Sequence, residues 1–255
     1  MSETVDRMQD SVFDRAEDLS AEVLVAEVVE QAKLDLGDSA GAGTGTASVC
    51  LTSSFQMEDM VVLHMLRQHL PQVAVIFLET GYHFAELIAY RDQMVKQWNL
   101  NLINALPRTS REEHEREFGL LHVVDPSRCC AIRKVEPLMR SLEHFRWWFT
   151  GLRREQSPTR AGLKKIENHL LPTGAILKKV SVLADWNWEQ VEGYAQKHAI
   201  PRLSLYDRGY RSIGCEPCTA VPAAGADARS GRWGGKKLEC GIHTFSAKEE
   251  PQAPA

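Results

Sequence analysis

The chain has 255 residues, which is enough for one large α/β domain with flexible ends or for two small domains. Its 34 acidic and 30 basic side chains give a net charge of −4, a balance that does not indicate binding to nucleic acids or to a membrane surface. The N-terminus is polar, and no apolar run approaches the roughly 18 residues that a membrane span needs, so we expect a cytoplasmic protein.

Apolar residues at helical spacing predict an N-terminal helix from about Ser11 to Leu36, and the glycine-rich stretch after it predicts a linker that ends near residue 46. The next elements are a strand at 49–51, a turn at 53–59, a helix from Met60 and a buried strand at 73–78. Apolar runs at 100–103 and 146–150 alternate with helical segments at 84–98 and 129–142. Because strands separated by helices form βαβ units, the sequence predicts a mostly parallel twisted sheet with helices on both faces.

Loops follow three of the predicted strands, at 52–59, 79–83 and 151–160. In parallel sheets, ligands bind beyond the carboxyl ends of the strands, so we expect these loops to share one site. Ser53 and Ser54 stand where a phosphate loop would lie, although the G-K-[ST] of a Walker motif is absent. Arg153 and Arg154 follow another strand, where guanidinium groups can bind phosphate or sulfate through paired hydrogen bonds; two solvated loop arginines are the alternative.

Four of the six cysteines form an adjacent pair and a C-x-x-C motif: Cys129, Cys130, Cys215 and Cys218. In a reducing compartment such cysteines are more often ligands or catalytic thiols than disulfides. Asp125 and Pro126 predict a helix start just before the pair, and Arg133 and Lys134 place a cation on the face of each thiol. The residues alone leave three interpretations open: an iron-sulfur cluster, a four-cysteine zinc site, or unmetallated core thiols.

A fifth cysteine, Cys240, stands apart near the C-terminus between Glu239 and His243. Basic residues precede it, and cations both lower the pKa of a thiol and hold an anionic substrate beside it. The stretch from 219 to 237 is rich in Ala and Gly, so we expect 219–246 to be a mobile segment that delivers a nucleophilic thiol, and 247–255 to be a disordered tail. The alternative is a surface cysteine in a flexible tail. The remaining candidates are assigned to packing or the surface: Cys50, His83, His122, Trp186 and Trp188.

Six motifs together resemble those of the assimilatory adenylylsulfate (APS) reductases. They lie at 53–59, 79–84, 129–134, 150–157, 214–219 and 239–243, and the resemblance runs from about residue 48 to 243. It implies an adenine-nucleotide α-hydrolase-like sheet in a reductase domain at 47–218, one [4Fe-4S] cluster per chain on the four cysteines, and thioredoxin as the reductant. It also implies that the Cys240 thiolate attacks the sulfur of APS, releases AMP and leaves an S-sulfocysteine that thioredoxin converts to sulfite.

The same resemblance assigns roles to the remaining site residues. The nucleotide pocket would be lined by Ser53, Ser54, Phe55, Leu78 and Gly151, and the substrate anions would meet Lys134, Arg153, Arg160, Arg229, Arg232 and His243. One alternative is a reductase of the 3′-phosphorylated substrate, PAPS, or of both nucleotides. Another is a non-catalytic nucleotide-binding protein with a structural zinc site. A homo-oligomer is compatible with the sequence, and a partner nucleic acid is not expected.

Overall fold

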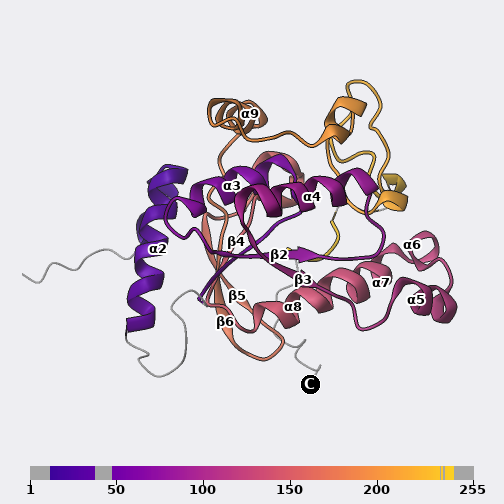
Figure 1. Ribbon diagram of the computed structural model, residues 1–255, viewed down its shortest axis with the longest axis horizontal. Coiled ribbons are helices and arrows are strands. Elements are labelled where there is room, and N and C mark those ends of the chain that lie inside the picture. The colour runs from indigo at the N-terminus through magenta and orange to yellow at the C-terminus, as the bar shows by residue number, and fades with distance from the viewer. Residues whose placement is uncertain (1–11, 38–47, 236, 238, 244–255) are drawn as a thin grey trace, which may run out of the picture.

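The structure is a computed structural model that describes residues 12–37, 48–235, 237 and 239–243. A six-stranded sheet lies at its centre, in the order β3-β2-β1-β4-β6-β5 (Figure 1). The strands are β1 (Val49–Thr52), β2 (Ala74–Leu78), β3 (Asn101–Ala105), β4 (Trp147–Phe149), β5 (Ile166–Leu170) and β6 (Ile176–Val180). Neighbouring strands are parallel except for β5, which runs antiparallel to β6.

The α-helices are α1 (Val12–Arg15), α2 (Ala21–Gly37), α3 (Met57–Arg67), α4 (Ala85–Trp98), α5 (Arg111–Phe118), α6 (Leu121–Val124), α7 (Pro126–Cys130), α8 (Glu136–Leu142) and α9 (Trp188–Lys197). A π-helical turn, Ala131–Val135, joins α7 to α8. Short 3₁₀ helices occupy Ala16–Asp18, Arg154–Gln156, Pro158–Arg160, Ser204–Arg208, Glu216–Cys218 and Trp233–Gly235. None of the helices in these described ranges is both long and apolar enough to cross a bilayer.

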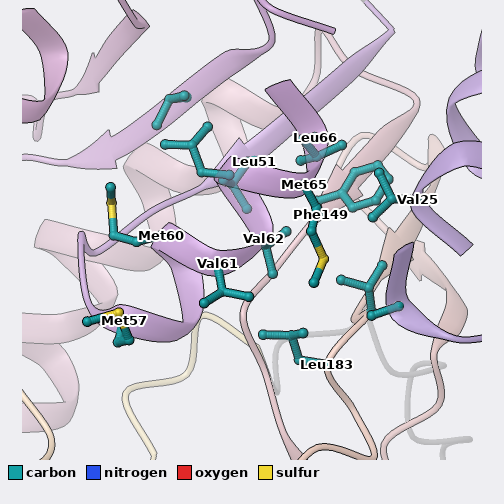
Figure 2. Packing of buried hydrophobic residues seen from close by; sticks show 14 of the residues in the cluster. Val25, Leu51, Met57, Met60, Val61, Val62, Met65, Leu66, Phe149 and Leu183 are labelled. Carbon is teal, nitrogen blue, oxygen red and sulfur yellow. The ribbon is translucent and has the colours of Figure 1, made fainter. Parts of the chain in front are cut away.

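The sheet separates two hydrophobic clusters, because successive side chains of a strand point to opposite faces. On β4, Trp147 and Phe149 pack into the larger cluster, whereas Trp148 between them packs into the smaller one. Helices α2 and α3 cover the larger cluster, as Figure 2 shows around Leu51 of β1. Helix α8 covers the other face through Leu138, Met139 and Leu142. The predicted fold class, a mostly parallel sheet with helices on both faces, is therefore confirmed.

Two predictions about individual elements need correction, and two elements were not predicted. Helix α3 begins at Met57 rather than Met60, because Gln56 is still extended and the chain turns helical directly after it. The N-terminal helix is interrupted: the Oγ of Ser20 accepts a hydrogen bond from the amide of Val23 (3.4 Å) and α2 begins at Ala21. The β5–β6 hairpin and α9 were not predicted. The linker and the C-terminal tail lie outside the described residues.

The order of the strands brings the predicted loops together. Strand β2 lies on one side of β1 and β4 on the other, so the strand order reverses between β1 and β4. A crevice forms at such a switch point, beyond the carboxyl ends of the strands. The loops that begin after Thr52 and Phe149 both open into it.

Candidate active site

A cavity of about 770 Å³ lies at this switch point. It is large enough for a nucleotide, because small-molecule pockets commonly measure roughly 300–1,000 Å³. Its wall combines the loops after β1, β2 and β4 with the C-terminal segment. Eleven of the twelve residues predicted to act on the substrate line it: Ser53, Ser54, Leu78, Lys134, Gly151, Arg153, Arg160, Arg229, Arg232, Cys240 and His243.

Phe55 is the exception among the predicted residues. Its side chain is fully buried in the core, with its ring centroid 5.8 Å from that of Phe77. Its backbone takes a positive φ of 57°, and its amide donates to Ser53 Oγ (3.0 Å). Phe55 therefore shapes the loop after β1 from beneath, and its ring does not face the cavity.

A carboxylate holds the loops after β1 and β4 together. Asp59 Oδ2 accepts hydrogen bonds from the amide (2.7 Å) and the hydroxyl (2.6 Å) of Ser54. Burial raises the pKa of Asp59 to about 6, although these bonds and one from the Gly151 backbone oppose the rise. A Cβ on Gly151 would lie 2.4 Å from Asp59 Oδ1, so only glycine permits this close approach.

The cavity arginines are already engaged with carboxylates. Arg153 forms an ion pair with Glu58 (3.1 Å). Arg160 donates Nε and Nη2 to the two oxygens of Glu239 (2.9 and 2.8 Å), and Arg229 pairs with the same carboxylate at 3.4 Å. Burial alone would raise the pKa of Glu239, but these guanidinium groups hold it below its ordinary value. Glu239 thus fastens the residue before Cys240 to two of the predicted anion-binding arginines.

A second, small cavity lies next to the first. It is lined by the four cysteines of the adjacent pair and the C-x-x-C motif, Cys129, Cys130, Cys215 and Cys218. Burial, together with the nearby sulfur atoms of Cys130, Cys215 and Cys218, raises the pKa of Cys129 to about 12. Four thiolates this close together repel one another unless a cationic group binds between them. Across the described residues, no three His, Cys, Asp or Glu side chains converge closely enough to hold a single metal ion. The thiols therefore share one cavity without forming a single-ion cage.

Two side chains form the wall between the cavities. Lys134 and Trp233 line both of them. Burial alone would lower the pKa of Lys134, but the sulfur atoms of Cys215, Cys240 and Cys130 raise it above its ordinary value. Lys134 therefore interacts electrostatically both with the four clustered cysteines and with Cys240.

Comparison with known proteins agrees with this arrangement. A sequence model of the phosphoadenosine phosphosulfate reductase domain matches residues 48–221. The chain is 41% identical over 219 residues to the adenosine 5′-phosphosulfate reductase of Rhodococcus opacus, which covers 85% of this chain and 87% of that protein. The chain belongs to the phosphoadenosine phosphosulfate reductase family.

Relatives in this family carry both substrate names. A protein of Gloeobacter violaceus that is 40% identical over 232 residues is named phosphoadenosine 5′-phosphosulfate reductase, and the match covers 89% of this chain and 90% of that protein. The fold is shared with the crystal structure of a phosphoadenylyl-sulfate reductase from Candida auris in a phosphate complex, with a TM-score of 0.62 and 23% identity. That match covers 82% of this chain and 94% of the other.

Sequence reasoning missed several residues of this reductase's cavity. His83 and Trp188, which we assigned to packing or the surface, both line it, as do Glu58 and Asp59. The ring of His83 lies within hydrogen-bond distance of the Leu78 carbonyl (2.9 Å), and burial lowers its pKa to about 4. The usable signal was the position of His83 directly after a parallel strand, where cavity residues gather.

Proposed function

We propose that the protein reduces adenosine 5′-phosphosulfate to sulfite and AMP in sulfate assimilation and cysteine biosynthesis, in the cytoplasm. The observation that carries the proposal is the position of Cys240. Its thiol lines the same cavity as Lys134, Arg229 and Arg232, so one nucleophile faces a group of cations at a nucleotide-sized site. Cationic side chains can bind the phosphate and sulfate oxygens of a phosphosulfate. The loops proposed to bind the nucleotide line another part of the same cavity.

The reaction divides into two transfers. In the first, the Cys240 thiolate forms a bond to the sulfur of the substrate, the bond from that sulfur to the phosphate oxygen breaks, and AMP leaves with the electron pair. In the second, a thiolate of thioredoxin attacks Cys240 Sγ, and sulfite leaves with the electron pair of the broken S–S bond. The second thiol of thioredoxin then releases Cys240 as a thiol and closes a disulfide, so the dithiol supplies both electrons.

The residues of this chain have separate tasks in the first transfer. Ser54 and Gly151, fixed by Asp59, would hold the nucleotide at the strand ends. Lys134 and Arg232 would bind the negative charge that moves onto the leaving phosphate oxygen. Glu239 holds its neighbour Cys240 at the cavity through Arg160.

We also propose that the four clustered cysteines bind a [4Fe-4S] cluster. The donor set fits: four thiols face one cavity, and cationic Arg133 and Lys134 line its wall. Four thiolate ligands are the donor set that a [4Fe-4S] cluster takes. By the family resemblance, the cluster supplies structure and a local field rather than electrons to the substrate.

A single turnover without reductant tests the function. Mixing the enzyme with excess APS should release about one AMP per chain and leave an S-sulfonate on Cys240, detected by mass spectrometry of the peptide. The Cys240→Ser variant should release no AMP, whereas Cys50→Ser, which alters a thiol fully buried in the core, should behave as wild type. A Cys240→Ser variant with full activity would rule out the mechanism.

Two further measurements separate the alternatives. The ratio of kcat/KM for APS to that for PAPS measures which nucleotide the enzyme prefers, and a ratio in favour of PAPS would reassign the substrate. Iron, acid-labile sulfide and zinc should be determined in anaerobically purified protein. About four irons and four sulfides per chain would support the cluster, whereas zinc without turnover would favour the nucleotide-binding alternative.

A further inference from the structure

The residues after Cys240 make contacts with the central sheet that the two transfer steps do not use. Ile242 lies against the smaller hydrophobic cluster. The ring of His243 stacks on that of Trp148, with centroids 5.7 Å apart and an interplanar angle of 16°. Trp148 is itself fully buried, and its Nε1 donates to Thr52 Oγ1 (2.9 Å). The C-terminal segment therefore contacts a rigid part of the central strands.

A buried lysine holds the same segment. Lys179 Nζ donates to the backbone carbonyl of His243 (3.4 Å) and to Glu167 (2.6 Å), and it lies 5.7 Å from the centroid of the Trp148 ring. The Lys179 side chain is only 3% exposed. A buried ammonium group is costly unless its donors are satisfied, and the carbonyl of His243 supplies one of the acceptors.

Two imidazole rings complete the contact. The ring of His169 packs edge-on against Trp148, with centroids 5.2 Å apart. Burial lowers the pKa of His169 to about 4, and burial together with the charge of Lys179 keeps the pKa of His243 well below its ordinary value. Both rings are therefore neutral near pH 7, so His243 can stack here beside the lysine without charge repulsion.

We propose that Trp148, His169 and Lys179 form a docking site for the chain at His243, the tail cradle, and that the cradle positions Cys240 for attack on the substrate. This inference rests on the proposed function. Glu239 is fixed to Arg160 on one side of Cys240, and His243 is fixed in the cradle on the other. The four-residue step between these anchors spans at most about 14 Å, so fixing both ends leaves Cys240 little freedom.

Lysine variants at neighbouring positions test the cradle in the full-length enzyme. Lys179→Met should slow the single-turnover transfer of sulfonate to Cys240 by about tenfold, the effect expected for losing one hydrogen bond from a charged donor. The affinity for AMP should not change, because Lys179 is a positioning residue and does not line the nucleotide cavity. Lys179→Arg should restore most of the rate. Lys178→Met is the matched control, since Lys178 bonds to Asn168 and lies over Phe13 instead.

A second pair of variants keeps the test valid if Lys179→Met fails to fold. His169→Ala removes the ring that packs against Trp148 and should slow the transfer severalfold, whereas His169→Phe keeps a ring there and should retain most of the rate. Equal loss in both variants would overturn the proposal, because it would mean that the ring contact with Trp148 does not support the cradle. Transfer at the wild-type rate in Lys179→Met, or equal slowing in Lys178→Met, would also overturn it. If the wild type forms no S-sulfocysteine, the proposed function itself fails instead.

Discussion

Replacing Glu239 with Gln should release the segment that carries Cys240. The carboxylate accepts two hydrogen bonds from Arg160, and it also binds Thr159 Oγ1 (3.1 Å). Both partners of the Arg160–Glu239 pair are 10% exposed. Losing one partner of a fully buried pair costs about 3–5 kcal/mol, and an exposed pair contributes about 0–1 kcal/mol, so a cost of about 2 kcal/mol is expected here. That corresponds to a roughly thirtyfold larger undocked population.

The population of the undocked segment can be measured through the thiol itself. A maleimide too bulky for the cavity should modify Cys240 only when the segment leaves, so its rate follows the undocked fraction. The rate should rise roughly thirtyfold in Glu239→Gln and stay unchanged in Glu143→Gln, an exposed carboxylate away from the cavity. The pKa of Glu239 is held below its ordinary value, so docking should persist at and above that value and weaken only as the pH falls through the lower, folded-state pKa.

An unchanged labelling rate in Glu239→Gln would refute this reasoning. It would mean that the ion pair is not what holds the segment and that the contacts of His243 are sufficient. A rise of the same size in both variants would instead indicate a general loosening of the fold.

The remaining predictions concern the nucleotide end of the cavity. Gly151→Ala should weaken AMP binding at least about tenfold by calorimetry, because its Cβ would meet Asp59, whereas Gly162→Ala, with nothing within 4 Å, should bind normally. The affinity for AMP should also fall as the pH drops below 6, where Asp59 gains a proton and loses an acceptor for Ser54. Because the phosphate of AMP gains a proton in the same range, Asp59→Asn should weaken the pH dependence to the part that comes from the nucleotide. The pKa of Asp59 is higher in the folded protein than in the unfolded chain, so protonation of Asp59 stabilises the fold. The fall in AMP affinity at low pH would therefore not result from unfolding. His83, with its pKa lowered to about 4, stays neutral, so His83→Gln should leave the pH profile of kcat/KM above about pH 5 unchanged.

The sequence was sufficient for the parallel core and for the loops that form the cavity. Strands β1, β2 and β4 are apolar enough to be recognised, and the side chains just after them lie where the strand order predicts. The cysteine motifs were recognisable because their spacing does not depend on the fold. Their gathering around one cavity was an expectation of the resemblance rather than of the spacing.

The β5–β6 hairpin was missed because charged and polar residues interrupt its buried apolar positions, Ile166, Leu177 and Val180. Lys179 of β6 is buried, and so is Lys165 just before β5. Lys165 bonds to the carbonyl groups of Glu17 and Leu19 (3.1 and 2.7 Å) and pairs with Asp185 (2.8 Å), all distant in the sequence. From sequence alone, a lysine is expected at the surface. The alternation of buried and exposed residues that identifies a strand was therefore not recognisable here.

Contacts between distant parts of the chain also explain why the sequence revealed only part of the role of His243. A histidine three residues after a nucleophilic thiol suggests contact with the substrate, and His243 does line the cavity. Its stack on Trp148 depends on a central strand far away in the chain, and no local pattern predicts that contact. Long-range contacts of this kind decide whether a site residue binds the substrate or positions another residue.

Both anchors of the Cys240 segment are polar, and this limits how tightly the segment can dock. A hydrogen bond from a charged donor and a stacked ring pair each contribute about 1–2 kcal/mol, so the docked state is favoured by only a few kcal/mol. The guanidinium of Arg160 bonds to Glu239 through Nε and Nη2 and to Gln156 through Nη1, which leaves one N–H donor unused on each of Nη1 and Nη2. A substrate oxygen can therefore bind Arg160 while its ion pair with Glu239 stays intact. Any effect of that binding on docking of the thiol must be matched by an equal effect of docking on the affinity for the substrate.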